Sequence, residues 1–389
     1  MSRKLYCFIW LNLLTISISS SYAANLSISN SDAQIKEQIS KIFQQNKIPG
    51  GAVIIYDNGK IRQIYIGTSN KQTKSPINAN TIFELGSLTK TFTANLLAQQ
   101  MLNNQMQPNQ TILDDVKNKA IYSPSFKKMT LLELATHTSS LPYGIPNIRY
   151  NAQTTDNNIS IYNKFLKTWQ AGYPSGTKML YSNVGYALLG NILAQSESKS
   201  LSALYSQNIF KPLGMGSTFT TVSPNLANYA QGYDGDGNPN RTPNEGIFGG
   251  SWAIKSTPTD MAKYLQAAIA GSPLQKAFQI SQTGYFIFSN GEQQGLAWNV
   301  SPLDEISNAQ LLKIKPLIPN SRTPEPVKAI TAPNFNHNAL IEKTGATDGF
   351  NSYIGLIPSQ KIGIVIMTNH FSYDYRILKS TGRQILLNH

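Results

Sequence analysis

The alternation of hydrophobic and polar residues predicts a helix and then a β-hairpin near the start of the chain. Apolar residues between positions 35 and 43 share one helical face, and Asn30 or Ser31 can cap the helix that carries them. Two β-rich runs follow at 52–56 and 61–66, and the Asp-Asn-Gly turn between them is a strong hairpin signal. This segment is therefore expected to supply two antiparallel strands.

The end of the chain has the same character. Three runs of β-branched and apolar residues, at 339–343, 353–356 and 362–368, predict strands, and the segment from about Tyr375 to Leu387 predicts a closing helix. Strands at both ends of one chain suggest a single antiparallel sheet built from the two termini.

The middle of the chain, about 81–272, is mostly helical in pattern. Within Ser87–Met101, apolar residues such as Phe92 and Leu96 fall on one side of a predicted helix, and Thr257 begins another with a proline and an acidic residue in its first turn. The expected fold is α/β: an antiparallel sheet built from both termini and flanked by helices, with an inserted, mostly helical subdomain at about 81–272. Clefts between such lobes are common sites of small-molecule chemistry.

The first 23 residues have the pattern of a secretory signal peptide. Two basic residues precede an apolar stretch from Leu5 to Ile18, and small residues lead to Ala23, after which we expect cleavage. A retained membrane anchor is disfavoured because this stretch is shorter than the ~20 residues that a spanning helix needs. The only cysteine, Cys7, lies in the leader, so residues 24–389 are expected to form a cysteine-free, periplasmic, single-domain protein.

Composition and charge narrow the functional classes. The 389-residue chain is 41% hydrophobic and 14% charged, which is an ordinary globular composition. Its formal net charge of +13 falls to +11 without Arg3 and Lys4, and the remaining basic residues are dispersed. Nucleic-acid binding is therefore disfavoured, whereas an evenly basic surface suits solubility and anionic small molecules. The four histidines, His137, His337, His370 and His389, show no ligand spacing, so we expect no metal or other cofactor.

Ser87 and Lys90 place a hydroxyl and an amine three residues apart at the start of a predicted helix, on one face. Serine is a poor nucleophile until a base takes its proton, and a lysine with a lowered pKa can act as that base. The positive end of the helix disfavours an ammonium and favours a developing oxyanion. The same spacing recurs at Ser125–Lys128 and Ser196–Lys199, which we interpret as solvated surface, so this pattern alone is weak.

Two further motifs follow in the sequence. Tyr181-Ser182-Asn183 has a second match at Tyr56-Asp57-Asn58 in the predicted hairpin, and is also weak alone. Lys343-Thr344-Gly345 occurs once, at the end of a predicted strand. A lysine there can hold a carboxylate or tune neighbouring pKa values, and the glycine lets a substrate approach the strand backbone.

The order of the three motifs, Ser-x-x-Lys, Tyr-x-Asn and Lys-Thr-Gly, resembles that of the penicillin-recognising serine enzymes. Tyrosine in the middle motif points away from class A β-lactamases, whose middle motif is Ser-Asp-Asn. The chain is similar to class C β-lactamases over nearly its whole mature length, from about Ile35 to Leu386. The stretches that carry this resemblance are 81–92, 255–261, 295–298, 326–331, 343–350 and 354–358.

The resemblance implies a β-lactamase-like fold and a covalent mechanism. Ser87 would attack the lactam carbonyl, and Lys90 and Tyr181 would move protons from the serine and to the leaving nitrogen. Tyr181 would then help to activate the water that releases the product. The backbone N–H groups of Ser87 and Ala346 would form the oxyanion hole. The expected substrate contacts are Asn183 at the acyl amide, Trp252 in the acyl pocket, Lys343 and Thr344 near the carboxylate, and Gly345 along the strand.

Several positions depart from the class C pattern. Gly144 stands where these enzymes usually have a glutamine, and Trp252 where they have a tyrosine. Asp348 and Asn351 replace frequent glycines, and the segment 369–376 lacks the usual asparagine-rich carboxylate site. These changes leave the predicted catalytic residues in place and bear on the choice of substrate.

Other functions remain open at this point. A D,D-peptidase or an esterase of the same family would use the same nucleophile, and would differ from a β-lactamase in how fast water clears the acyl-enzyme. A non-catalytic penicilloyl-binding sensor would predict the loss of Tyr181 or a fused membrane segment, and neither feature is seen. We expect a β-lactamase that acts on penicillins and cephalosporins as a monomer.

Overall fold

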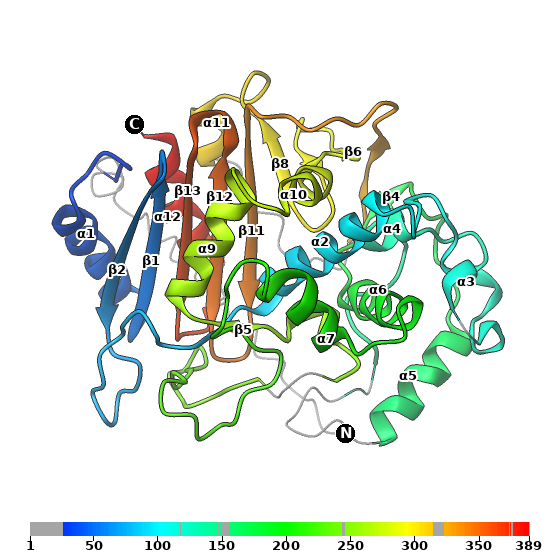
Figure 1. Cartoon of the computed structure of the whole chain (residues 1–389), viewed down its shortest axis with the longest axis horizontal. Helices are drawn as coiled ribbons and strands as arrows, with labels where there is room; N and C mark the ends of the chain where they lie inside the picture. The colour runs from blue at the N-terminus through cyan, green and yellow to red at the C-terminus, as the bar shows by residue number, and fades with distance from the viewer. Residues whose placement is uncertain are drawn as a thin grey trace, which may run out of the picture.

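One large antiparallel sheet organises the computed structural model, which describes residues 26–116, 118–146, 148, 156–242, 246–313, 323–372, 374 and 376–388 (Figure 1). Within these residues the order of the nine strands is β10-β6-β7-β8-β11-β12-β13-β1-β2. The strands are β1 (Gly50–Asp57), β2 (Lys60–Gly67), β6 (Phe286–Ile287), β7 (Gln293–Gln294), β8 (Asn299–Pro302), β10 (Lys328–Ala329), β11 (Ala339–Ala346), β12 (Asn351–Ile357) and β13 (Ile362–Thr368).

The two ends of the chain meet in this sheet, as the sequence predicts. β1 pairs with the late strand β13, so that Val53 lies opposite Ile366. All residues of β13 and all but the last of β1 are buried, which explains their nearly continuous apolar runs. The hairpin between β1 and β2 turns at Asn58 and Gly59, whose positive φ angles of 47° and 92° suit a two-residue hairpin turn.

The strands between Phe286 and Ala329 are absent from the sequence-based prediction. β6, β7, β8 and β10 extend the sheet beyond β11, but each has only two to four residues. Runs this short show no period that a sequence pattern can reveal. They matter for the site, because β8 pairs with β11 only over 339–342, while β12 pairs with it over 341–346.

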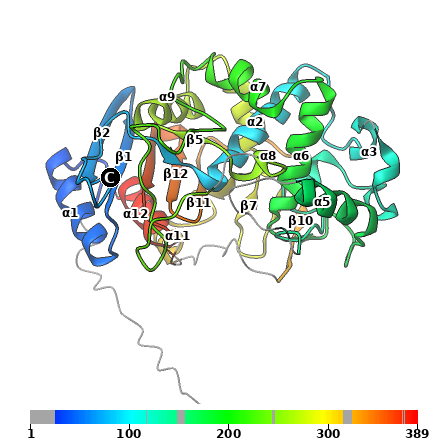
Figure 2. The same cartoon turned by 90° about the horizontal axis from the view of Figure 1, so that it is seen from below.

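Helices cover both faces of the sheet. α9 (Pro258–Ile269) packs on one face, and α1 (Asp32–Gln45) and α12 (Arg376–Leu387) lie on the other (Figure 2). α1 begins behind Ser31, which forms a capping box with Gln34, so Ser31 is the cap of the two candidates. Tyr375, the predicted first residue of the last helix, lies outside the described residues.

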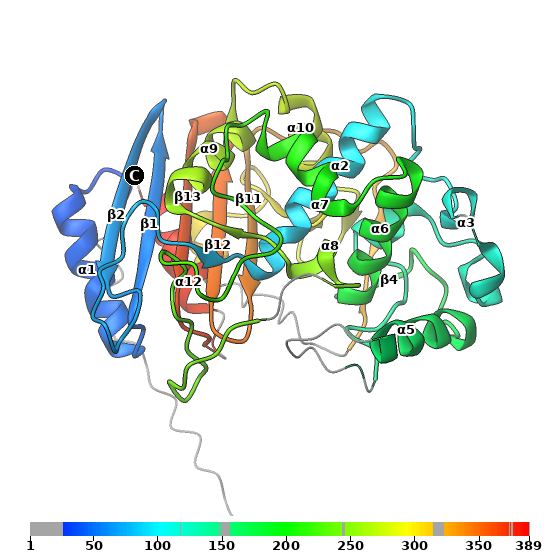
Figure 3. The ribbon, with the colours of Figure 1, turned by 60° about the horizontal axis from the view of Figure 1, so that its bottom comes forward.

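Most of the remaining helices form a lobe beside the sheet, with α2 near its centre (Figure 3). Two short strand pairs, β3 (Phe83–Glu84) with β5 (Lys255–Ser256) and β4 (Lys178–Met179) with β9 (Glu325–Pro326), accompany them. The helices of this lobe are α2 (Thr89–Leu102), α3 (Ile112–Asp115), α4 (Leu131–Ala135), α5 (Asp156–Thr168), α6 (Asn183–Ser196), α7 (Leu201–Tyr205), α8 (Gly249–Trp252) and α10 (Gln275–Gln282). The short helix α11 (Asn308–Lys313) packs instead against α12 at the sheet.

Helix α2 differs from its prediction in two respects. Ser87 lies in a 3₁₀ turn, η2 (Gly86–Leu88), and the α-helix begins at Thr89. The helix is also buried around most of its circumference instead of on one apolar face. The hydroxyl of Thr91 bonds to Tyr264 and that of Thr93 to Tyr205, so these polar side chains are satisfied inside the protein. Helical periodicity fails here because the helix is enclosed by other elements.

A buried cluster of charges fastens α12 to the sheet. Glu342 on β11 lies 2.9 Å from the Lys379 ammonium, accepts a 2.9 Å hydrogen bond from Tyr353 and pairs with Arg383. Burial by itself would raise the pKa of Glu342, but the charges of Arg383 and Lys379 hold it at about 2. The carboxylate is therefore ionised inside the protein.

Breaking this cluster is expected to destabilise the fold. Arg383→Met leaves the buried Glu342 without its bidentate partner, and we expect the free energy of unfolding to fall by about 3–5 kcal/mol. The control is Arg376→Met in the same helix, whose side chain is 60% exposed and pairs with Asp374 at the surface. That change should cost at most about 1 kcal/mol. Urea unfolding measures both free energies. Equal losses for the two variants would contradict the role of the buried charge cluster in holding α12 to the sheet.

In the described part of the chain, no helix combines the length and apolar character needed to cross a membrane. The predicted leader, residues 1–23 with Cys7, lies outside that part.

Candidate active site

Ser87 lies where the helical lobe meets the end of strand β11. Gly86 precedes it with φ of +53°, and a Cβ at this glycine would come within 2.6 Å of the Ala346 backbone nitrogen. The hydroxyl of Ser352 donates a 2.7 Å hydrogen bond to the Leu85 carbonyl and ties the same turn to β12. Glycine is required here because only it tolerates both the left-handed conformation and the close approach. The turn thus brings Gly86, the residue before Ser87, against the backbone of Ala346.

Lys90 is fully buried beneath Ser87, one turn along the chain. Its Nζ lies 3.1 Å from Ser87 Oγ, and it donates hydrogen bonds to Asn183 Oδ1 at 2.7 Å and to the Ser251 carbonyl at 3.0 Å. Burial, and then the positive charge of Lys343, lowers the pKa of Lys90 well below its usual range. A neutral amine so placed can accept the proton of the serine hydroxyl.

Tyr181 lies between two lysines. The Nζ atoms of Lys90 and Lys343 are each 5.1 Å from the centre of its ring. The next residue, Ser182, caps α6 by accepting a hydrogen bond from Gly185 N, which fixes where the tyrosine leaves the chain. The phenol of Tyr181 therefore lies close to the amine that would take the serine proton and can take part in the same proton path.

Lys343 is 4% exposed and lies on the segment of β11 that β8 leaves unpaired. Its Nζ donates a 2.8 Å hydrogen bond to the Thr344 carbonyl. Burial, reinforced by the charge of Lys379 and opposed by Glu342, lowers its pKa to about 7. Lys343 therefore gains or loses its charge near neutral pH. The adjacent backbone edge, 343–346, can accept an extended ligand as a strand would be accepted.

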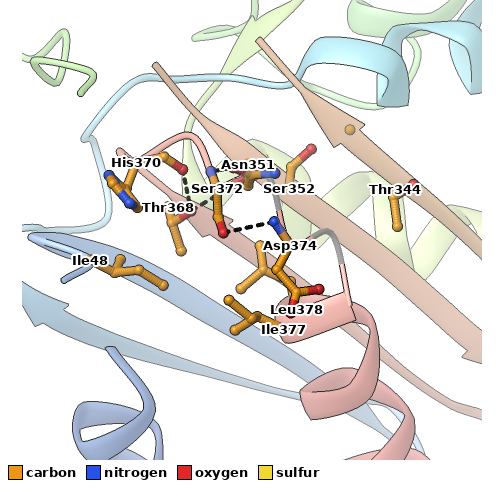
Figure 4. Close-up of a pocket in the computed structure, with 11 residues that line it drawn as sticks. Ile48, Thr344, Asn351, Ser352, Thr368, His370, Ser372, Asp374, Ile377 and Leu378 are labelled. Carbon is orange, nitrogen blue, oxygen red and sulfur yellow. Dashed lines mark hydrogen bonds between the residues drawn. The ribbon is translucent and has the colours of Figure 1, made fainter. Parts of the chain in front are cut away.

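Thr344 and Gly345 line a pocket between the ends of the strands and the start of α12. Figure 4 shows Thr344 on β11, apart from the group that His370, Ser372 and Asp374 form at the far side of this pocket. Side chains alternate along a strand, so the side chain of Thr344 points away from that of Lys343. The other expected carboxylate contact, Lys343, has its ammonium 5.1 Å from the centre of the Tyr181 ring.

The predicted substrate contacts in the helical lobe lie near the same centre. Asn183 bonds to Lys90, and Trp252 follows Ser251, whose carbonyl also bonds to Lys90. Trp252 is half-buried and stacks on Phe248, with ring centres 4.6 Å apart. The stacking on Phe248 therefore restricts the orientation of the Trp252 ring.

Two residues beside the site escaped the sequence analysis. His137, noted there only for its lack of metal-ligand spacing, is buried and packs against Tyr181, with ring centres 4.3 Å apart. Tyr143, next to Gly144, hydrogen-bonds through its side chain to Asn183, and its carbonyl accepts a 3.0 Å hydrogen bond from the Asn183 backbone. The one available signal in the sequence was that Tyr143 is an aromatic residue in a loop rich in proline and glycine. The spacing along the chain links neither His137 nor Tyr143 to the three motifs.

The other departures from the class C pattern lie at the margin. Asp348 is exposed, and its backbone N–H donates to the Thr242 hydroxyl at 3.1 Å. Asn351 is buried, and its Oδ1 accepts a 2.6 Å hydrogen bond from Ser372 N. Asn351 therefore joins β12 to the segment after β13.

The second copies of the Ser-x-x-Lys and Tyr-x-Asn patterns lie in surroundings that differ from those of the candidate site. Lys128 and Lys199 are exposed, as expected of solvated surface, and Tyr56-Asp57-Asn58 lies in the β1–β2 hairpin. In the described residues, no group of three or more His, Cys, Asp or Glu side chains could hold a metal ion.

Comparison with known proteins identifies the family. The family model described as Beta-lactamase matches residues 35–385. The chain belongs to the beta-lactamase family. A beta-lactamase from Lysobacter lactamgenus is 34% identical over 354 residues, which cover 88% of this chain and 87% of the relative. One from Pseudomonas fluorescens is 31% identical over 350 residues, which cover 86% and 92%.

Solved structures of this family share the whole fold. A crystal structure of a class C beta-lactamase in complex with cefoxitin has a TM-score of 0.80 and 30% identity, and the match covers 91% of this chain and 98% of that one. A D-alanine carboxypeptidase from Burkholderia cenocepacia has a TM-score of 0.78 and 29% identity, with 90% and 97% covered. These matches confirm the predicted α/β class C fold and the prediction of a serine β-lactamase.

Proposed function

We propose that this member of the beta-lactamase family hydrolyses the lactam amide through an ester on Ser87. The observation that carries the proposal is the contact between Ser87 Oγ and the buried Nζ of Lys90, whose pKa is lowered. Lys90 takes the hydroxyl proton as Ser87 attacks the carbonyl carbon. The backbone N–H groups of Ser87 and Ala346 stabilise the oxyanion that develops on the carbonyl oxygen.

Proton transfer to the leaving nitrogen completes the first half of the reaction. Tyr181, held between Lys90 and Lys343, delivers that proton and leaves an open-ring acyl-enzyme. In the second half, the tyrosine takes a proton from water, and the resulting hydroxide attacks the ester. The ester bond to Ser87 then breaks and the serine recovers its proton through Lys90. Each transfer needs a donor or acceptor within hydrogen-bond reach.

The substrate is held on both sides of the reacting carbonyl. We infer that Asn183 contacts the acyl amide, that Trp252 bounds the acyl pocket, and that Lys343 attracts the carboxylate. Thr344 and Gly345 contribute the strand edge along which the substrate lies. Gly144 offers no side chain to the acyl amide, so the phenol of Tyr143, bonded to Asn183, is the polar group on that side.

A D,D-peptidase is the second candidate, favoured by the similarity to a D-alanine carboxypeptidase. Both activities acylate Ser87, so the decisive quantity is the rate at which water clears the ester. We expect many turnovers of a chromogenic cephalosporin at ~1–10³ s⁻¹, with a short-lived adduct in time-resolved mass spectra. An adduct that persists for hours, together with cleavage of D-alanyl-D-alanine peptides, would overturn the β-lactamase proposal.

The pKa of Lys343 predicts the pH dependence. Below about 7 its ammonium attracts a substrate carboxylate, and above that pH the neutral amine does not. We therefore expect kcat/KM for a carboxylate-bearing β-lactam to fall as the pH rises through about 7. Lys343→Arg should lose this limb, because a guanidinium stays charged throughout the range. If the limb persists in that variant, another group is responsible for it.

We also propose that the protein is exported to the periplasm and acts there as a monomer. The charged start, apolar core and small-residue exit of residues 1–23 support export. Intact mass of the secreted protein should correspond to a chain that begins at Ala24. A detergent-extracted form that retains Met1 would contradict this proposal.

A further inference from the structure

We propose that His137 is a positioning residue that holds Tyr181 beside Lys90 and Lys343 by hydrogen-bonding to the backbone on both sides of the tyrosine and packing against its ring. This inference rests on the proposed function only in giving Tyr181 a proton to transfer. The contacts that carry it are independent of any substrate.

Three contacts surround the tyrosine. The carbonyl of His137 accepts a 2.9 Å hydrogen bond from Leu180 N, the residue before Tyr181. The ring Nδ1 of His137 accepts a 3.1 Å hydrogen bond from Ser182 N, the residue after it. The imidazole itself packs on the phenol ring at 4.3 Å, with an interplanar angle of 33°. One residue thus fixes both neighbouring amides and the ring.

These three contacts, which together we call the clamp, require a neutral His137 imidazole. Because Nδ1 accepts a hydrogen bond, the ring proton of the neutral form lies on Nε2. Protonation of Nδ1 would place two N–H donors opposite each other and would add a positive charge close to Lys90 and Lys343. Burial, together with the charges of those two lysines, lowers the pKa of His137 well below its usual range. The imidazole of His137 therefore stays neutral near pH 7, where Lys343 gains or loses its charge.

Two features of His137 are energetically unfavourable: its backbone conformation and an unpaired ring nitrogen. His137 has a φ of 61°, which is uncommon for residues other than glycine. Its buried Nε2 has no hydrogen-bond partner among the residues that the structure describes. Strained backbone and an unsatisfied buried group tend to occur where function over-determines the structure.

The test compares two substitutions. Asparagine tolerates a positive φ and places Oδ1 near the position of Nδ1, so His137→Asn keeps the acceptor for Ser182 N. His137→Ala removes both the acceptor and the ring. We expect His137→Ala to slow acylation of Ser87 by a β-lactam about 10–10²-fold, the range that a displaced catalytic group produces. His137→Asn should restore the rate to within about threefold of the parent.

A double-mutant cycle separates positioning from general damage. In the Tyr181→Phe background, His137→Ala should slow acylation by no more than about twofold, because no phenol remains to be positioned. An equal loss in both backgrounds would overturn the proposal, as would an asparagine variant as slow as the alanine variant. The control is His337→Asn, which changes an exposed histidine and should leave the rate unchanged.

A second measurement needs no substrate. The ¹³Cζ NMR signal of Tyr181, assigned by its absence from the Tyr181→Phe spectrum, should shift in His137→Ala and return towards the parent position in His137→Asn. If the parent protein forms no adduct with β-lactams, the proposed function fails while this signal still tests the clamp. A signal unmoved by His137→Ala would overturn the clamp itself.

Discussion

Ser87→Ala is expected to abolish the acyl adduct and to lower β-lactam turnover by about 10⁴-fold or more. No other group in the proposed mechanism can form the ester, and removal of a nucleophile leaves only the catalysis that binding and the oxyanion donors supply. The substitution removes one oxygen at a half-buried position, so the fold should persist. Intact-mass spectra after mixing with a penicillin, together with steady-state rates, measure both effects.

A matched control lies elsewhere in the chain. Ser196 has the same three-residue spacing to Lys199, but both residues are exposed. Ser196→Ala should therefore leave turnover and adduct unchanged. An adduct that survives in Ser87→Ala would place the nucleophile at another residue and would refute the central assignment.

Lys90→Ala and Tyr181→Phe are each expected to lower the rate by roughly 10²–10⁴-fold, the usual contribution of a positioned acid or base. The two residues act on one proton path, so the double variant should lose less than the product of the single losses. Thermal unfolding checks that each variant folds, since Lys90 bonds to both Asn183 and the Ser251 carbonyl.

The sequence again supplies controls. Lys199→Ala removes an exposed lysine of the repeated Ser-x-x-Lys spacing, and Tyr56→Phe removes a buried phenol of the repeated Tyr-x-Asn pattern. Neither should change the rate. If Tyr181→Phe turns over as fast as the parent, Tyr181 is a packing residue and the proton must reach the leaving nitrogen by another route.

The sequence by itself determined the terminal part of the sheet. Long apolar runs such as those of β1 and β13, and the Asn58-Gly59 turn, carry their signal within a few residues, because strand burial and turn geometry are local constraints. It also identified Ser87, Lys90, Tyr181 and Lys343 as the candidate catalytic centre. That identification needed the order of three motifs, since two of the motifs recur elsewhere in the chain.

Only the tertiary structure decided how these residues work. Lys90 and Asn183 are 93 positions apart and bond at 2.7 Å, and no periodicity encodes that contact. The lowered pKa values of Lys90 and Lys343 arise from burial, reinforced by the charge of Lys343 on Lys90 and by the charge of Lys379 on Lys343. Both causes depend on what encloses the two lysines. The grip of His137 on Tyr181 and the unpaired edge of β11 were likewise invisible in the sequence. Residue types and local order name the chemical groups, whereas their protonation and alignment come from contacts that exist only after the chain has folded.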